Sequence, residues 1–258
     1  MMEQISSADF AADPEVDFKV LLEDPDFLVV EKNAGIHVHP LKADEKGTLY
    51  QGVISRYPEI ASIGNNPREG GLLHRLDQDT SGSILFARNQ KAYDFLKEEF
   101  KKRRITKEYI ALVSGKVSET NGHIEIPIAH HQKNSKKMIC VKNKGIKVRG
   151  EAREAVTYYE LIDNYPEASL LKIQIPTGVR HQIRVHMAFL GHPILGDLLY
   201  GGKTPYPFDI PRLFLHASRL EFRHPQSPHP LVKVESALPA DLNKVLQNLS
   251  ATKSSILR

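Results

Sequence analysis

The sequence predicts an α+β fold, with a mostly antiparallel central sheet and flanking helices and loops. Apolar runs of strand length far outnumber the segments with helical spacing. Few of these runs are joined by a helix of the kind that links parallel strands, which favours antiparallel pairing. The chain has 258 residues, of which 41% are hydrophobic and 26% charged, so it can bury a substantial core.

The first part of the chain alternates strands with two helices. Residues 27–40 predict a strand, a turn and a short second strand that ends at a proline, and residues 48–58 predict a helix that also ends at a proline. The runs 70–77 and 82–89 predict two strands joined by a tight polar turn. Residues 91–104 predict a helix, because apolar residues recur on one side and basic residues fill its last turn.

The rest of the chain is richer in strands. We expect one strand at 106–117, several short strands within 118–176 and a further strand at 212–222. Residues 179–191 predict a helix, since apolar residues recur at spacings of four, four and three before a glycine. Residues 239–250 predict a closing helix with a proline at its start.

Composition suggests one main domain and excludes several classes of protein. We expect an acidic, mobile tail over residues 1–17 and a single domain over residues 18–258. No apolar run approaches the length of a membrane helix, and the first residues do not resemble a signal peptide. Cys140 is the single cysteine, so no intramolecular disulfide or thiolate metal cluster can form. We therefore expect a cytoplasmic protein with no membrane association.

Positive charge is concentrated in two segments. Residues 133–153 hold eight basic residues and one acidic one, and residues 101–107 form a second basic cluster. Such patches attract polyanions, although a lysine-rich surface that simply faces solvent explains them equally well.

Most familiar catalytic patterns are missing. None of the 12 histidines stands in the helical histidine–glutamate pattern of a zincin, so we expect no metal site. There is no phosphate-binding glycine loop and no serine in a GxSxG elbow.

What remains is a carboxylate with an aromatic residue and arginines. Asp77 ends a strand-like run, Tyr109 stands near the start of the next strand after a basic helix, and Arg184 shares a helix face with Arg180 at i, i+4. Each has an ordinary alternative. Asp77 can form an Asx turn, Tyr109 can be a core aromatic, and Arg184 can be a surface residue.

Taken together, these residues resemble a known family. The stretch "HRLDQDTSGSILFA" is similar to the signature of the RluA-type RNA pseudouridine synthases, which is Arg-Leu-Asp, two variable residues, then Thr-Ser-Gly. Four further segments resemble family motifs in the same order: "LLEDPDFLVVEKNAGIHVHP", "KEYIALVSG", "TGVRHQIRVHMAFLGHPILGDLLYGG" and "LFLHASRLEFRHP". The resemblance covers roughly residues 20 to 240.

The resemblance implies the pseudouridine synthase fold and an isomerase that detaches uracil from its ribose in RNA, turns the base and rejoins it through carbon 5. Asp77 is then the catalytic carboxylate, Arg184 pairs with it, and Tyr109 stacks on the uracil. Nothing is consumed, so no cofactor or metal is needed. The implied partner is ribosomal or transfer RNA, and we expect a monomer with no obligatory protein partner.

Further residues are implied to bind the substrate. Arg75 steadies the RNA backbone or fills the gap left by a flipped nucleotide, and Ile183 packs on the base. Arg180, His181 and Gln182 complete this set. Val179 stands where the family usually has arginine, and Arg180 takes the variable position. We expect Arg180, in the first turn of its helix, to supply a backbone contact instead.

Two further expectations follow from the resemblance. Many family members carry an N-terminal S4-type RNA-binding domain. Fewer than about twenty residues precede the resemblance here, so we expect no such domain. The basic stretch 133–153 is the natural candidate for gripping RNA. The alternative function is a catalytically idle RNA-binding protein on the same fold.

Overall fold

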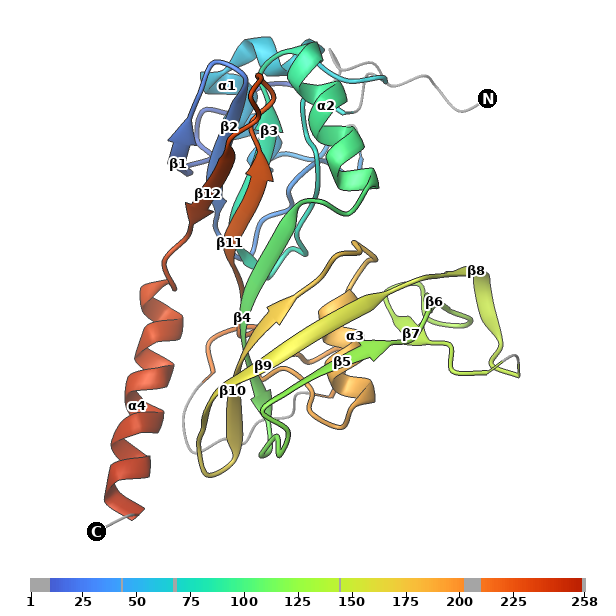
Figure 1. The fold of residues 1–258 in the computed structure, drawn as a ribbon, viewed down its shortest axis with the longest axis vertical. Helices are drawn as coiled ribbons and strands as arrows, with labels where there is room; N and C mark the ends of the chain where they lie inside the picture. Colours follow the sequence, from blue (N-terminus) through green and yellow to red (C-terminus); the bar gives the residue numbers. More distant parts are fainter. Residues whose placement is uncertain (1–9, 43, 67–68, 144, 202–209, 257–258) are drawn as a thin grey trace. The chain divides into compact units, whose positions relative to one another are not determined.

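The computed structural model describes residues 10–42, 44–66, 69–143, 145–201 and 210–256 (Figure 1). They form two compact units, and each is built from two stretches of the chain. The first unit comprises residues up to 106 together with 217–236, and the second comprises 107–216 together with the segment from 237 onward.

The first unit is a sheet with helices on both faces. Its strands follow the order β1-β2-β3-β11, and β12 pairs with β11. The bounds are β1 Lys19–Glu23, β2 Phe27–Lys32, β3 Ser81–Ala87, β11 Leu215–Arg223, β12 Leu231–Glu235, α1 Leu49–Arg56, the 3-10 helix η2 Pro58–Ser62, and α2 Gln90–Lys101.

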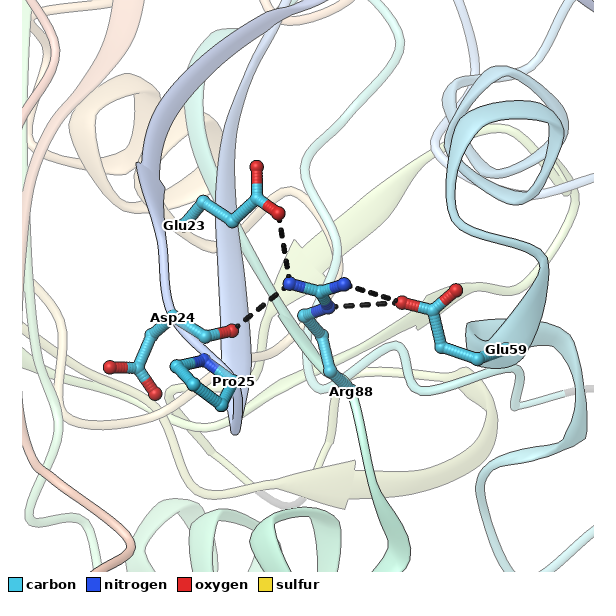
Figure 2. A pocket seen from close by; sticks show the side chains of 5 residues that line it. All are labelled: Glu23, Asp24, Pro25, Glu59 and Arg88. Carbon is cyan, nitrogen blue, oxygen red and sulfur yellow. Dashed lines mark hydrogen bonds and ion pairs between the residues drawn. The ribbon is translucent and has the colours of Figure 1, made fainter.

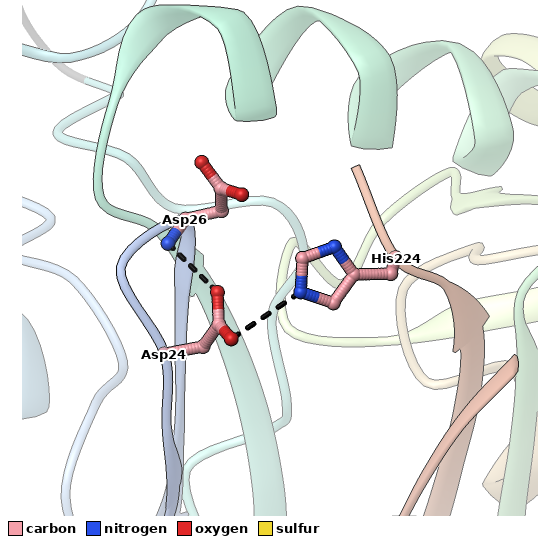
Figure 3. Close-up of side chains that lie close together, drawn as sticks. All are labelled: Asp24, Asp26 and His224. Atoms are coloured by element: carbon pink, nitrogen blue, oxygen red, sulfur yellow. Dashed lines mark hydrogen bonds and ion pairs between the residues drawn. The ribbon is translucent and has the colours of Figure 1, made fainter. Parts of the chain in front are cut away.

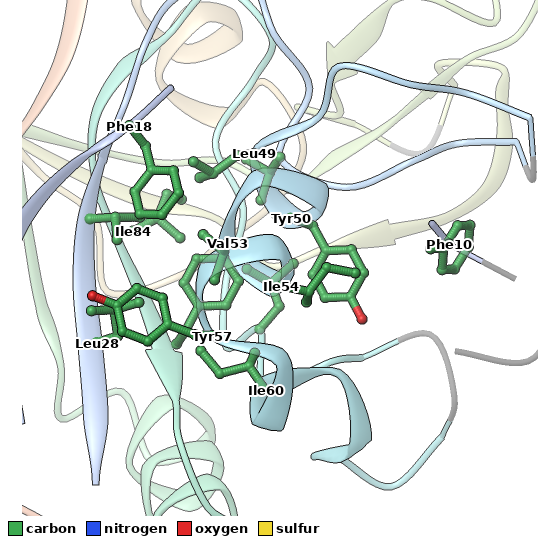
Figure 4. Close-up of a cluster of buried hydrophobic side chains, with 14 residues drawn as sticks. Phe10, Phe18, Leu28, Leu49, Tyr50, Val53, Ile54, Tyr57, Ile60 and Ile84 are labelled. Atoms are coloured by element: carbon green, nitrogen blue, oxygen red, sulfur yellow. The ribbon is translucent and has the colours of Figure 1, made fainter. Parts of the chain in front are cut away.

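The core of this unit explains why its central strands read as continuous apolar runs. Successive side chains of a strand point to opposite faces. Leu28 of β2 and Phe86 of β3 therefore pack with α1 on one face (Figure 4), while Val29 and Leu85 pack with α2 on the other. Both faces are covered, so neither strand alternates with polar residues.

The N-terminal segment is held against this unit where the structure describes it. Phe10 is buried, and its ring meets that of His39 edge-on at a centroid distance of 4.9 Å. The backbone N–H of Asp13 donates to the carbonyl of Gln51 at 3.1 Å. The part of the expected tail before residue 10 lies outside the described residues.

The second unit is richer in strands. Its main sheet has the order β4-β10-β9-β5, and a small sheet has the order β7-β6-β8. The bounds are β4 Thr106–Ser114, β5 Asn121–Glu125, β6 Ile128–His131, β7 Met138–Cys140, β8 Val148–Arg153, β9 Val156–Asn164, β10 Ala168–Gln174, α3 Gln182–Phe189 and α4 Ala240–Ile256.

The architecture confirms the predicted fold class. The strand pairs whose register the structure describes are antiparallel in both units. Within the described part of the chain, the helices are too short or too polar to cross a membrane.

Three expected elements differ. The strand predicted at 70–77 is reduced to one bridge between Leu72 and Phe86. The short second strand within 27–40 does not form, and the helix predicted at 179–191 begins at Gln182.

Candidate active site

Asp77 lies on a loop of the first unit that ends in a tight turn. The backbone N–H of Thr80 donates to the carbonyl of Asp77 at 3.1 Å, which closes a four-residue turn over Gln78 and Asp79. Asp77 is half-buried, whereas Asp79 and Arg75 are exposed. The predicted polar turn is therefore present, although an irregular extended segment leads into it instead of a strand.

A buried lysine fixes this turn to a second turn. Lys32 is fully buried at the end of β2, and its ammonium donates to the carbonyls of Asn33 at 2.8 Å, Ile36 at 2.9 Å and Gln78 at 2.7 Å. Gly35 adds two hydrogen bonds between the turns. Its backbone N–H donates to the backbone carbonyl of Gln78, and its own carbonyl accepts from the side-chain amide of Gln78. Charge-assisted bonds of this kind are strong, so the residue after Asp77 has little freedom.

Lys32 has a role that the sequence analysis missed. Its signal was a charged residue that closes the apolar run "FLVVEK" just before a turn. A lysine is almost never fully buried unless it is paired, so its burial at a turn indicates a structural task.

The glycine that follows the turn is required by geometry. Gly82 has a φ of +120°, and a Cβ atom there would lie 2.3 Å from the carbonyl oxygen of Ala217 on β11. The neighbouring Ser83 hydroxyl donates to the same carbonyl at 3.2 Å. A side chain at position 82 would push β3 away from β11 and displace the start of the strand that follows Asp77.

Tyr109 lies on β4 in the second unit and is 5% exposed. It stands opposite Ile173 of β10 and lies on the same face of the strand as Lys107 and Ala111, which are also buried. The ammonium of Lys107 donates to the Thr177 carbonyl at 3.0 Å, and burial lowers the pKa of Lys107 to about 8. The hydrogen bond from Lys107 therefore connects the face of β4 that carries Tyr109 to the segment that leads into α3.

Arg184 is held by a carboxylate that the sequence analysis did not assign. Its Nε and Nη2 atoms donate to the two oxygens of Asp197 at 2.7 and 2.9 Å, and both residues are buried. Asp197 also accepts the backbone N–H groups of Leu199 and Tyr200, and the guanidinium carbon lies 5.2 Å from the Tyr200 ring centroid. A guanidinium has five donors in a planar fork, so this pairing fixes Arg184 and is compatible with a second anion.

Gln182 ties together the turn before α3. Its side-chain oxygen accepts from the Val179 N–H at 3.1 Å and the Thr177 hydroxyl at 2.9 Å, and its amide donates to the Val156 carbonyl and the Thr157 hydroxyl. The residue is 2% exposed. These bonds support a positioning role for Gln182, and its contact with a substrate stays a prediction.

The late start of α3 corrects the expectation for Arg180. His181 caps the helix in the left-handed conformation, with a φ of 55°, so Arg180 precedes the helix and is exposed. Arg180 therefore does not lie in the first helical turn or share a helix face with Arg184. Val179 is buried in one apolar cluster with Val185.

The predicted site residues are divided between the two units. Arg75 and Asp77 belong to the first, whereas Tyr109, Arg180, His181, Gln182, Ile183 and Arg184 belong to the second. The pairing of Asp77 with Arg184 therefore stays a prediction.

Charged groups also gather at the turn between β1 and β2, away from the predicted site residues in sequence. Arg88 pairs with both Glu23 and Glu59, and all three residues line a pocket (Figure 2). Beside it, Asp24 contacts the Nε2 atom of His224 at 3.3 Å and caps the N–H of Asp26 (Figure 3).

Those three residues, Asp24, Asp26 and His224, form the one cluster of possible metal ligands within the described residues. Existing bonds already engage it. His224 Nδ1 accepts the N–H of Gln226, and Asp26 accepts from the Asn89 amide at 2.8 Å. The cluster therefore joins the β1–β2 turn to the end of β11, and no metal is inferred from it.

Comparison with known proteins decides the family. The family model described as "RNA pseudouridylate synthase" matches residues 26–189, a span that contains Asp77, Tyr109 and Arg184. This chain belongs to that family.

Individual pseudouridine synthases are similar over most of the chain. The "Uncharacterized RNA pseudouridine synthase YlyB" of Bacillus subtilis strain 168 is 33% identical over 241 residues, which cover 93% of this chain and 75% of that protein. The "Ribosomal large subunit pseudouridine synthase D" of Xanthomonas campestris pv. campestris is 36% identical over 250 residues, which cover 93% of this chain and 71% of that protein. The solved structure of "Human RNA Pseudouridylate Synthase Domain Containing 1" has a TM-score of 0.68 at 27% identity, covering 92% of this chain and 96% of that chain.

These findings confirm the resemblance seen in the sequence and show that the protein is an RNA pseudouridine synthase, an isomerase. In this pseudouridine synthase, the signature turn, the tyrosine strand and the arginine helix are each rigidly built. Lys32 holds the first, strand pairing with β10 holds the second, and Asp197 with Gln182 holds the third.

Proposed function

We propose that this enzyme converts specific uridines of structured RNA to pseudouridine with Asp77 as the catalytic carboxylate. The observation that carries this proposal is the fixed turn at Asp77, where Lys32 and Gly35 hold the next residue. A carboxylate on a rigid turn keeps its aim at a bound substrate, which is a large part of enzymatic rate enhancement.

The remaining groups suit the same reaction. The N1–C1′ bond of uridine breaks, the base turns, and a C5–C1′ bond forms. The C5 proton leaves and N1 gains a proton, so the product is an isomer. Arg184 beside Asp77 would keep the carboxylate ionised. Tyr109 would stack on a base that must turn, a contact that is less directional than hydrogen bonds. Ile183 would pack on the same base.

Residues around these groups are proposed to bind the RNA. Arg75 is exposed two positions before Asp77, which suits a contact with the backbone or with the gap left by a flipped nucleotide. Arg180 is exposed just before the start of α3, and its guanidinium is proposed to contact a phosphate without help from the helix N-terminus. His181 and Gln182 are proposed to shape the substrate site, Gln182 through the turn it holds.

Ribosomal RNA is the proposed substrate class. The names of similar proteins from Xanthomonas campestris, Nitrosomonas europaea and Haemophilus ducreyi each specify the ribosomal large subunit, which supports large-subunit RNA over transfer RNA. The chain spans 65–75% of the length of four similar curated proteins, so target choice by the whole protein is part of the proposal. A monomeric, cytoplasmic enzyme stays our expectation.

The test uses RNA labelled with tritium at uracil carbon 5. Wild type should release tritium from ribosomal RNA, and Asp77→Asn should abolish release while keeping RNA binding and thermal stability. Asp79→Asn is the matched control, because it makes the same change at an exposed position of the same turn. A folded Asp77→Asn variant that releases tritium at the wild-type rate would refute the role of Asp77.

The same assay examines two further points. Tyr109→Leu should lose much more activity than Tyr109→Phe, which keeps the stacking face. Equal losses would assign the role to the hydroxyl. RNA binding by the wild type without tritium release from any RNA would support the idle RNA-binding alternative.

A further inference from the structure

The second unit carries a small sheet that we call the basic arm, formed by residues 128–153 with strands β6, β7 and β8 (Figure 1). Its described residues include one acidic side chain, Glu151, and seven basic ones. The basic residues are exposed except for the half-buried Lys137, and they are Lys133, Lys136, Lys137, Lys142, Lys147, Arg149 and Arg153.

Ion pairing distinguishes the basic arm from the other basic cluster of the sequence. On α2, Lys101 and Lys102 both pair with Glu98, and Arg104 pairs with Glu99. Among the residues that the structure describes, no carboxylate pairs with any of the seven basic side chains of the arm. A lysine-rich surface that only faces solvent usually carries interspersed acidic residues, whereas a surface for polyanions leaves its charge uncompensated.

The basic arm is rigidly mounted beside the arginine helix. Ile128, Met138 and Cys140 lie on its inner face and pack in one buried cluster with Val179 and Val185. The Cys140 thiol also contacts the Val185 carbonyl at 3.9 Å. The arm is therefore a platform with an apolar underside and a charged outside.

The turn between β6 and β7 presents two lysines in an ordered form. The His131 Nδ1 atom accepts the N–H groups of Lys133 and Asn134 at 3.2 and 3.1 Å. The Asn134 side chain accepts the N–H of Lys136 at 3.0 Å. An ordered turn reduces the conformational entropy that its side chains and backbone lose on binding.

Tyr200 joins the basic arm to the start of α3. Its hydroxyl accepts the N–H of Met138 at 2.7 Å and lies within hydrogen-bonding distance of His181 Nδ1, at 2.8 Å. Lys137 immediately precedes Met138 and Arg180 immediately precedes His181, so the Tyr200 hydroxyl links the two segments that carry these charges. The positive charges of both can therefore act on one ligand.

We propose that the basic arm and Arg180 form one binding surface for the phosphate backbone of the RNA substrate, at the arginine helix. This inference rests on the proposed function for the identity of the polyanion. Exposed lysines and arginines match the regular negative charge of RNA. The charged edge strand β8 also disfavours strand addition by a protein partner.

The test compares two double variants in RNA binding. K133Q/K136Q removes two exposed charges from the arm, and K101Q/K102Q removes two exposed charges from the ion-paired cluster on α2. Binding to a fluorescently labelled RNA hairpin with a uridine-containing loop is measured from about 0.05 to 0.5 M salt, where each phosphate contact contributes about 0.7–0.9 to the slope of log affinity against log salt. K133Q/K136Q should lower this slope by about 1.4–1.8 units and weaken binding roughly 30-fold near 0.1 M salt.

The control variant should bind as the wild type does. Equal losses in both double variants would overturn the inference, because a general loss of positive charge would then explain them. An unchanged slope in K133Q/K136Q would overturn it as well. Tritium release reports separately on the proposed function. If the wild type releases tritium normally and K133Q/K136Q keeps the wild-type salt slope, only the RNA-binding role of the basic arm is refuted. If the wild type releases no tritium and K133Q/K136Q has a reduced salt slope, only the proposed reaction is refuted.

Discussion

Replacing Lys32 with methionine removes the charge that holds the turn beside Asp77 and keeps a side chain of similar length. The wild-type ammonium makes three bonds of 2.7–2.9 Å to backbone carbonyls. Each hydrogen bond to a charged group contributes about 1.5–3 kcal/mol. Methionine avoids the desolvation of a buried ammonium, which offsets several kcal/mol of that sum. We therefore expect a net loss of about 2–4 kcal/mol, because the carbonyls keep no equivalent donor.

A loss of that size should be visible in a thermal melt. About 2–4 °C per kcal/mol is typical for chains of 150–250 residues, so Tm should fall by roughly 5–15 °C. Lys19→Met is the matched control, since Lys19 is exposed on the neighbouring strand β1. Its Tm should change by less than about 2 °C, because surface substitutions usually stay within about 0.5 kcal/mol.

The same variant should lose activity beyond its loss of stability. Single-turnover tritium release, measured well below Tm, should fall at least about tenfold in Lys32→Met, since small misplacements of a catalytic group can cost up to about 100-fold. Lys19→Met should react at the wild-type rate. If Lys32→Met had the same Tm as the control Lys19→Met, the stabilising role of the three bonds would be wrong. If it melted low but reacted normally, the stabilising role would stand and the link to Asp77 would be wrong.

Two further predictions follow from buried groups of the second unit. Cys140 is 4% exposed, and burial raises the pKa of its thiol to about 12. Iodoacetamide at pH 8 should therefore label Cys140 in urea but not in the folded protein, as measured by mass spectrometry. Rapid labelling of the folded chain would contradict this prediction. Burial lowers the pKa of His186, whose Nδ1 contacts the Thr157 hydroxyl and whose Nε2 contacts the Ile126 carbonyl. The imidazole of the unfolded chain takes up a proton near pH 6.5, whereas that of the folded chain does so only at lower pH. The free energy of unfolding should therefore fall as the pH drops below about 6.5, and it should fall less in His186→Gln. Equal pH slopes in urea melts of the wild type and His186→Gln would refute the assignment.

The sequence was sufficient for the features that depend on neighbours along the chain. The turn at Asp77 follows from local polar residues and a glycine, and the structure shows it closed between Asp77 and Thr80. The apolar runs of β2 and β3 predicted strands, and the structure buries both faces of each. The order of five motifs identified the family, which the family model then confirmed.

Local patterns failed where sheet edges or side-chain bonds decided the outcome. The run 70–77 is apolar enough for a strand, but it shares one edge of β3 with β11, so it forms only the bridge between Leu72 and Phe86. The apolar spacing that begins at Val179 continues through α3. The helix nevertheless starts at Gln182, because the Gln182 side chain holds the preceding turn and His181 adopts a left-handed conformation.

The sequence by itself determined the fold class and the family, because these depend on composition and on short motifs, and it predicted which residues carry the reaction's chemistry. Only the tertiary structure decided how those residues are held. Lys32 reaches a carbonyl 46 positions away, and Asp197 meets Arg184 across 13 positions. Buried charges need partners wherever the fold supplies them, and no pattern of neighbouring residues records which distant atoms will meet them.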